Sequence, residues 1–159
     1  MVVDTDAPLP AGTFQLVDPV AWTLLEAAED PFVDHRPADP ACEASALEVE
    51  DDYLEIDTEL CGYASAQQPS LAAVAAGETV TTLLYHNALS APEVAEAHAA
   101  VTFGGELLWE RYIPIPSGAE VYTIETPVPA DRPIGTPLVF HLHNHGANTW
   151  NLVYVEVER

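Results

Sequence analysis

The sequence predicts an all-β fold, an antiparallel β-sandwich or jelly roll in a single domain. Short segments alternate apolar and polar residues at every second position, the period of a half-buried strand. The 14 prolines and 8 glycines fall mostly between these segments, where they favour turns. A length of 159 residues with 48% hydrophobic content suits one domain with one core.

The alternating segments give the expected elements in chain order. Residues 1–12 are predicted to be a loose N-terminal tail, and the sandwich domain spans 13–159. A loop rich in proline and aspartate follows the second strand, a short helical turn is expected at 70–76, and the last two strands form a hairpin. The candidate strands cover 13–17, 21–27, 46–50, 53–60, 78–89, 97–103, 106–113, 119–128, 137–145 and 149–158.

The two cysteines flank a predicted hairpin. If Asp51 and Asp52 form its tight turn, Glu50 faces Tyr53 and, in the same register, Cys42 faces Cys61. Opposed residues in an antiparallel pair have Cα atoms about 4.5–5.5 Å apart, which is within disulfide range. We expect a Cys42–Cys61 disulfide worth about 3 kcal/mol, although two reduced thiols stay an alternative. A disulfide implies an extracytoplasmic location: periplasm, cell surface or secreted.

The chain is strongly acidic. It has 26 aspartates and glutamates, four arginines and no lysine, so its formal net charge is −22. This charge repels nucleic acid and anionic membranes, and no apolar run approaches the about 20 residues of a membrane span. It suits a saline, halophilic setting, a cationic partner or calcium bound on the acidic face. In the predicted hairpin Glu48 faces Glu55, a repulsion that salt or a bound cation would relieve.

Three histidines alternate along one predicted strand. His141, His143 and His145 share one face, while Leu138 and Phe140 lie on the opposite, apolar face, which should point to the core. The histidines therefore belong to a groove or to a face covered by a loop. Histidines two residues apart lie about 6.6–7 Å from each other and can converge on one ion about 2.0–2.1 Å from each nitrogen.

Further ligands must come from neighbouring strands. His86 ends one candidate strand, and His98 lies opposite the apolar face of another, whereas His35 is expected to be a solvated loop residue. Imidazole ligands favour a transition metal, zinc or copper above all. The predicted metal ligands are His86, His98, His141, His143 and His145.

Other functions remain open at this point. The expected last hairpin places Trp150 and Tyr154 beside the histidines. Together with Trp109 they would stack on sugar rings, which predicts, as an alternative, a carbohydrate- or surface-binding module. Its partner would be a polysaccharide or a cell-surface component. The histidines would merely pack in a structural or adhesive surface protein. No nucleophile elbow or phosphate-binding loop is present, so the sequence favours metal binding over catalysis and assigns no catalytic residue.

Two resemblances bear on these alternatives. His141 and His143 resemble the HxH pair of cupins, which implies a jelly roll and a metal, although no glutamate follows at short spacing and no later histidine completes that motif. The segments "YHNAL", "AEAHAAV", "IPIPSGA" and "GTPLVFHLHNHGANTWNL" look like uncharacterised exported or lipoprotein-type domains of predatory bacteria. That similarity implies export and one β-sandwich, without an activity.

Overall fold

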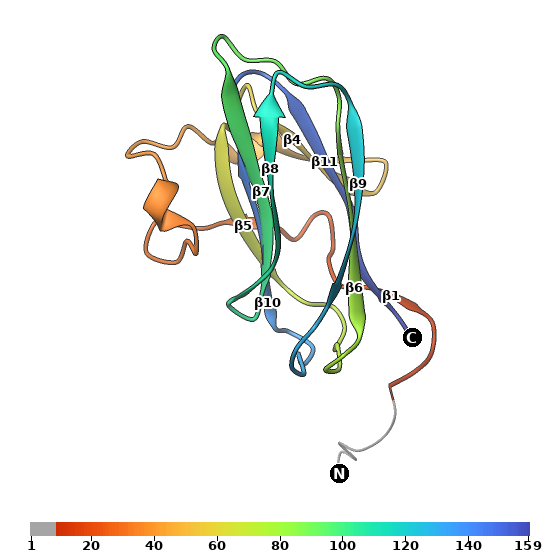
Figure 1. The fold of residues 1–159 in the computed structure, drawn as a ribbon. Coiled ribbons are helices and arrows are strands. Elements are labelled where there is room, and N and C mark those ends of the chain that lie inside the picture. The colour runs from red at the N-terminus through yellow and green to blue at the C-terminus, as the bar shows by residue number, and fades with distance from the viewer. Residues whose placement is uncertain (1–8) are drawn as a thin grey trace.

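A computed structural model describes residues 9–159 as two antiparallel sheets packed face to face (Figure 1). This confirms the predicted β-sandwich. The strands are β1 Thr13–Gln15, β2 Thr23–Leu24, β3 Leu47–Glu50, β4 Tyr53–Asp57, β5 Tyr63–Pro69, β6 Thr79–His86, β7 Ala95–Phe103, β8 Glu106–Ile115, β9 Glu120–Pro127, β10 Pro137–His143 and β11 Thr149–Glu158. The helical segments of the described residues are two 3₁₀ turns, η1 Val33–His35 and η2 Ala44–Ala46.

The strands divide between two sheets. Sheet A has the order β3-β4-β11-β6-β9, with β1 added to β11, and sheet B has the order β2-β5-β10-β7-β8. Apolar side chains at alternate positions of each strand fill the space between the sheets, as Phe140 of β10 and Trp150 of β11 do. The Trp109 indole crosses this core and donates to the Thr82 hydroxyl at 3.0 Å.

The disulfide hairpin has the predicted register. Glu50 pairs with Tyr53, and Cys42 pairs with Cys61, to which it is disulfide-bonded. Asp51 and Asp52 have φ angles of 45° and 68°, which fits a type I′ turn between strands. The predicted disulfide and its turn are therefore confirmed.

The predicted last hairpin is wrong. β10 lies between β5 and β7 in sheet B, whereas β11 lies between β4 and β6 in sheet A. The connection crosses from one sheet to the other, and the Thr58 hydroxyl holds it by donating to the Asn148 carbonyl at 2.6 Å and accepting from the Asn148 amide at 2.7 Å. Gly146 has a φ of 84° and passes so close to the Ser90 carbonyl that a Cβ would clash. Backbone hydrogen bonding within one hairpin is therefore replaced by side-chain hydrogen bonds between sheets.

A strand that the sequence pattern did not predict, β5, lies between β2 and β10 in sheet B. β5 pairs with both β2 and β10 and is buried on both faces, so its residues show no alternation. The expected helical turn at 70–76 is absent from the described residues, because Val74 instead pairs with Arg132 in an isolated bridge. Small residues of β5 such as Ala64 and Ala66 are buried between the neighbouring elements. Alanine is depleted in strands, so these residues do not indicate a strand in the sequence.

The N-terminal part of the chain joins sheet A through β1. Residues 1–8 of the predicted tail lie outside the described residues, and Gly12 exchanges backbone hydrogen bonds of 2.6 and 3.0 Å with Arg159. Among residues 9–159, no helix is long and apolar enough to cross a membrane.

Candidate metal centre

The outer face of sheet B carries a block of polar and aromatic side chains. Because β5, β10, β7 and β8 are neighbours, their registers bring residues far apart in sequence into two adjacent rows. One row contains Ser65, His141, Ala100 and Glu110, and the next contains Tyr63, His143, His98 and Tyr112. The prediction that His141 and His143 face away from the core is confirmed, since Leu138, Phe140 and Leu142 fill the core side.

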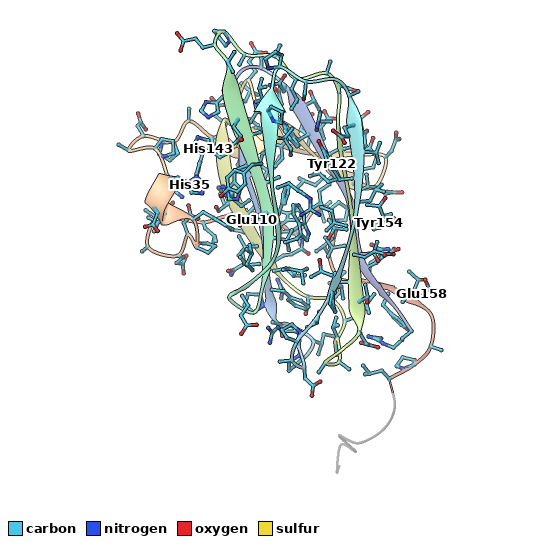
Figure 2. All side chains as sticks on the ribbon, viewed as in Figure 1. His35, Glu110, Tyr122, His143, Tyr154 and Glu158 are labelled. Atoms are coloured by element: carbon cyan, nitrogen blue, oxygen red, sulfur yellow. A yellow bond between two sulfur atoms is a disulfide. The ribbon has the colours of Figure 1, made fainter. Side chains whose placement is uncertain are left out.

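A connecting segment covers these rows. Residues 25–42, here called the strap, run beside β5 with η1 at their centre (orange in Figure 1). The strap places Phe32 on His141, with ring centroids 4.2 Å apart and planes inclined by 21°. His35 follows in η1 and reaches the same cluster (Figure 2). A loop therefore covers the histidine face, which is one of the two arrangements that the sequence indicated.

Asp30 anchors the strap to β5. Its carboxylate accepts hydrogen bonds from Tyr63 at 2.5 Å and from Ser65 at 2.8 Å, and pairs with Arg36 at 2.9 Å. Burial raises the pKa of Asp30, but the bonds from Tyr63, the Phe32 amide, Ser65 and Arg36 outweigh it, so the pKa is lowered. Asp30 is therefore ionised and satisfied, although only 5% of it is exposed.

Three histidines converge under the strap. His35, His98 and His141 each offer one ring nitrogen, and these three nitrogens lie within 4.8 Å of one another. Their ring centroids are 4.9–5.0 Å apart. Two ligand nitrogens of one tetrahedral zinc ion are about 3.4 Å apart, and small side-chain rotations would bring these nitrogens to that distance.

One ring nitrogen of His141 is fixed and the other is free. The Ser65 hydroxyl donates to Asp30 and lies 2.9 Å from His141 Nδ1, so Nδ1 carries the proton and donates to Ser65. His141 Nε2 is then a lone pair, and this buried atom has no hydrogen-bond partner among residues 9–159.

His98 has the same arrangement with its nitrogens exchanged. Its Nε2 lies 2.9 Å from the Glu110 carboxylate and donates to it. Its Nδ1 is buried, and no described residue bonds to it. Tyr112 stacks flat on the ring, with centroids 4.4 Å apart and planes inclined by 10°, and so fixes its orientation.

His35 is held by a fourth histidine. His35 Nδ1 and His143 Nδ1 are 3.2 Å apart, so one of them donates to the other. If both Nδ1 atoms are used in this contact, His35 has Nε2 left for an ion. Each of the three convergent histidines therefore has one nitrogen oriented by a neighbour, which is the usual support around a metal ligand.

The surroundings of His35, His141 and His143 favour their neutral forms. Burial lowers the pKa of His141 to about 2, and the neighbouring His98 and His35 add to the effect. Burial, followed by His145 and His35, lowers the pKa of His143 to about 4. Burial and His98 also lower the pKa of His35. Neutral imidazoles are the form that binds metal, so protons compete little at neutral pH.

The cluster opens to solvent on one side. A pocket of about 250 Å³ is lined by three of the histidines together with a carboxylate and an aromatic ring: His35, His98, His143, Glu96 and Tyr112. Figure 2 shows His35, His143 and Glu110 on this side of the sandwich, away from Tyr122 and Tyr154 on the other.

The structure brings together only some of the predicted ligands. His98, His141 and His143 lie in the cluster, whereas His145 is exposed beside it, with its ring 5.0 Å from that of His143. The prediction that His86 joins them is wrong. His86 points into the sandwich from sheet A, where both its nitrogens are bonded, to Tyr122 at 2.9 Å and to the Asn87 carbonyl at 2.7 Å.

Several residues of the site were not predicted. His35 was expected to be solvated, because the loop around it has no periodicity that indicates a face. Ser65 lies in β5, a strand that the sequence pattern did not predict. Asp30 is one of 26 acidic residues, and nothing in the sequence distinguishes it from the others. Glu110 alone had a usable signal, since strand alternation places it on the face opposite Trp109.

The predicted sugar-stacking residues do not form a surface. Trp109 and Trp150 are 4% and 0% exposed in the core, so neither can stack on a ligand. That part of the prediction is wrong. For Trp150 it rested on the last hairpin, which does not form, and Trp109 points from β8 into the core. Tyr154 is half-buried on β11, far in topology from the histidines of sheet B.

Comparison with known proteins supports the fold. No protein-family model and no curated protein sequence matches the chain. Among solved structures, one described as "CBM4 structure and function" is 15% identical with a TM-score of 0.50, and the alignment covers 89% of each chain. The K3 adhesin domain of Lys-gingipain from Porphyromonas gingivalis is 15% identical with a TM-score of 0.48, covering 92% of this chain and 98% of that one. CBM35 from Paenibacillus barcinonensis is 11% identical with a TM-score of 0.40, covering 94% and 99%. What this chain shares with the CBM4 domain at that identity is the β-sandwich.

Proposed function

We propose that this protein is an extracytoplasmic, non-catalytic module that binds one transition-metal ion through His35, His98 and His141. The observation that carries the proposal is a pair of buried ring nitrogens, His98 Nδ1 and His141 Nε2, that have no hydrogen-bond partner among the described residues. They belong to histidines that each offer a nitrogen within 4.8 Å of the others. A buried polar atom left unsatisfied costs about 1–3 kcal/mol, and a shared ion would recover that cost at both atoms.

Simple packing of the histidines explains less. A packed histidine normally has both ring nitrogens bonded, as His86 does in the core. In the cluster, by contrast, Ser65 and Glu110 each bond to one ring nitrogen, and the other nitrogen has no partner within residues 9–159. Second partners that leave the inward nitrogens free are typical of metal ligands.

The ligand set favours zinc or copper. Three neutral imidazoles are borderline-soft donors that suit zinc, copper and nickel, whereas calcium and magnesium prefer oxygen. The net charge of −22 raises the local concentration of any divalent cation. An extracytoplasmic location is supported by the Cys42–Cys61 disulfide, because such bonds persist in oxidising compartments.

Metal analysis of untagged protein tests the proposal. After loading with zinc or copper and dialysis, the protein should retain about one equivalent of metal. His141→Ala should retain almost none, while the matched control His145→Ala retains it. If His141→Ala does not fold, Ser65→Ala serves instead and should weaken binding about 10–100-fold, the usual effect of losing a hydrogen bond to a ligand histidine. Wild-type protein without bound zinc, copper, nickel or cobalt would overturn the proposal.

A second candidate is carbohydrate binding. It is favoured by the likeness of 89% of the chain to the CBM4 domain, whose name denotes a carbohydrate-binding module. The side chain best placed for stacking on a sugar is Tyr112, which is 58% exposed on the face of sheet B. Retention on a panel of immobilised neutral polysaccharides tests this candidate, and absence of retention on all of them would count against it.

A further inference from the structure

The pocket beside the histidine cluster has a lining that suits a small ligand. Its wall contains His35, His98 and His143, and its remaining lining comes from Glu96 and Tyr112. Its volume of about 250 Å³ is below the about 300–1,000 Å³ of pockets for drug-sized ligands. A pocket of this size holds a single small ring rather than an extended chain.

Tyr112 gives this pocket a fixed aromatic surface. One face of the ring is covered by His98 at a centroid distance of 4.4 Å, yet the residue is 58% exposed, so its other face is open to solvent. Its hydroxyl lies 3.5 Å from the Glu110 carboxylate, which restricts rotation. An exposed, rigid aromatic face stacks on the CH groups of a sugar ring at little cost in side-chain entropy.

The charges around the pocket exclude anions. Glu96 lines it, Glu110 lies behind it on β8, and Asp34 precedes His35 in the strap. Carboxylates repel phosphates, sulfates and uronic acids, but they accept hydrogen bonds from neutral hydroxyl groups. The ligand that fits is therefore uncharged and rich in hydroxyls.

A metal ion held by three histidines keeps a coordination position open. Three protein ligands plus one exchangeable position are typical of zinc sites that bind an external molecule, whereas closed structural sites use four protein ligands. Two of the three convergent histidines, His35 and His98, also line the pocket, so an ion held by them would have its open position beside the pocket.

We infer that the ion and Tyr112 together bind a neutral sugar, with one hydroxyl on the metal, the ring on Tyr112 and a second hydroxyl on Glu96. This inference rests on the proposed metal site and names its ligand. It joins the two candidate functions at one place, since the bound metal strengthens sugar binding.

Calorimetric titration of the zinc-loaded and copper-loaded protein tests the inference. The probes are neutral oligosaccharides of xylan, cellulose, laminarin and mannan, with an oligogalacturonate as the anionic counterpart. At least one neutral probe should bind, and removal of the metal with EDTA should weaken that binding by about 10-fold or more, equivalent to about 1.4 kcal/mol. Tyr112→Ala, assayed at zinc concentrations where metal analysis shows the site to be filled, should lose about 10-fold in sugar affinity. The matched control Tyr154→Ala, on the other sheet, should lose neither.

The outcomes separate the two proposals. Protein that binds no metal contradicts the proposed function itself. Protein that binds metal but none of the neutral probes contradicts only the inference. Sugar affinity that EDTA leaves unchanged also overturns it, as does a preference for the oligogalacturonate. Loss of sugar binding in Tyr154→Ala rather than in Tyr112→Ala overturns it as well.

Discussion

At the scale of single residues, the site depends on which nitrogen of each histidine is occupied. Ser65 and Glu110 bind opposite nitrogens, Nδ1 of His141 and Nε2 of His98, yet both choices leave the inward nitrogen free. Burial, together with the neighbouring His98 and His35, lowers the pKa of His141 and so disfavours its protonation. The residues that orient the cluster are thus as informative as the histidines themselves.

These lowered pKa values predict acid sensitivity of the metal-free protein. The folded pKa of His141, about 2, lies below the unfolded value of 6.5. The unfolded chain therefore takes up protons first, so stability is complete above pH 6.5 and is lost as the pH falls toward the folded pKa. From pH 6.5 to pH 4 the loss is on the order of 3 kcal/mol for this one group, at about 1.4 kcal/mol per pKa unit. His143, with a folded pKa of about 4, adds to the loss over the same interval.

Thermal melts in EDTA and molar salt measure this effect with carboxylate repulsion screened. Tm should fall steadily below pH 6.5 in the wild type and less steeply in His141→Gln, which keeps a neutral side chain beside Ser65. His145→Gln, exposed outside the cluster, is the control and should retain the wild-type slope. Parallel curves for wild type and His141→Gln would show that His141 does not titrate in this way.

At the scale of elements, alternation of apolar and polar residues predicted strands whether their outer face is exposed, as in β8, or covered, as in β7. β3, β4, β7 and β8 and the two faces of β10 follow from it, and so does the register that pairs Cys42 with Cys61. It failed for β5, which is buried on both faces, and for the partner of β10, because sequence proximity favoured a hairpin. His35 could not be placed, since the strap is positioned by one buried carboxylate rather than by a pattern.

Replacement of that carboxylate should release the strap. Asp30→Ala removes the acceptor for Tyr63 and Ser65 and leaves Arg36 without its ion-pair partner. Loss of one partner of a buried pair costs about 3–5 kcal/mol, which here should appear first as local opening. Hydrogen exchange of a peptide spanning 25–42 should accelerate while β7 and β10 stay protected, and metal affinity should fall because His35 is no longer held.

A surface aspartate of the same strap is the matched control. Asp34→Ala leaves the bonds of Asp30 intact, so it should change neither exchange nor metal affinity appreciably. Unchanged exchange of the strap in Asp30→Ala would mean that Phe32 packing, rather than the carboxylate, holds it in place.

At the scale of the whole molecule, charge is the dominant feature. Of the four arginines, three pair with carboxylates, at Asp30, Glu106 and Glu78, which leaves most of the 26 acidic residues without an arginine partner. On the outer face of sheet A, Glu48 lies directly opposite Glu55, as predicted. Burial raises the pKa of Glu55, and Glu50, Glu48 and Asp57 raise it further, so its ionised form is disfavoured in the fold.

Salt should therefore stabilise this protein. The Debye length falls from about 10 Å at 0.1 M to about 3 Å at 1 M, so Tm should rise clearly over that range. Glu55→Gln removes one of two opposed charges and should stabilise the fold by about 0.2–1 kcal/mol, which raises Tm by roughly 1–4 °C in a domain of this size. This increase in Tm should be largest at low salt. Glu93→Gln, in an exposed loop before β7, is the matched control and should gain less.

The same melts distinguish screening from a bound cation. Screening depends on ionic strength, so sodium chloride and calcium chloride at equal ionic strength should raise Tm about equally, and Glu55→Gln should reduce the response to both. A calcium site on the acidic face would instead raise Tm at millimolar calcium by more than sodium does. The reason is that a ligand that binds only the folded state stabilises it in proportion to the logarithm of the ligand concentration. A Tm that does not respond to either salt would mean that the carboxylates are spaced widely enough for solvent to screen them already.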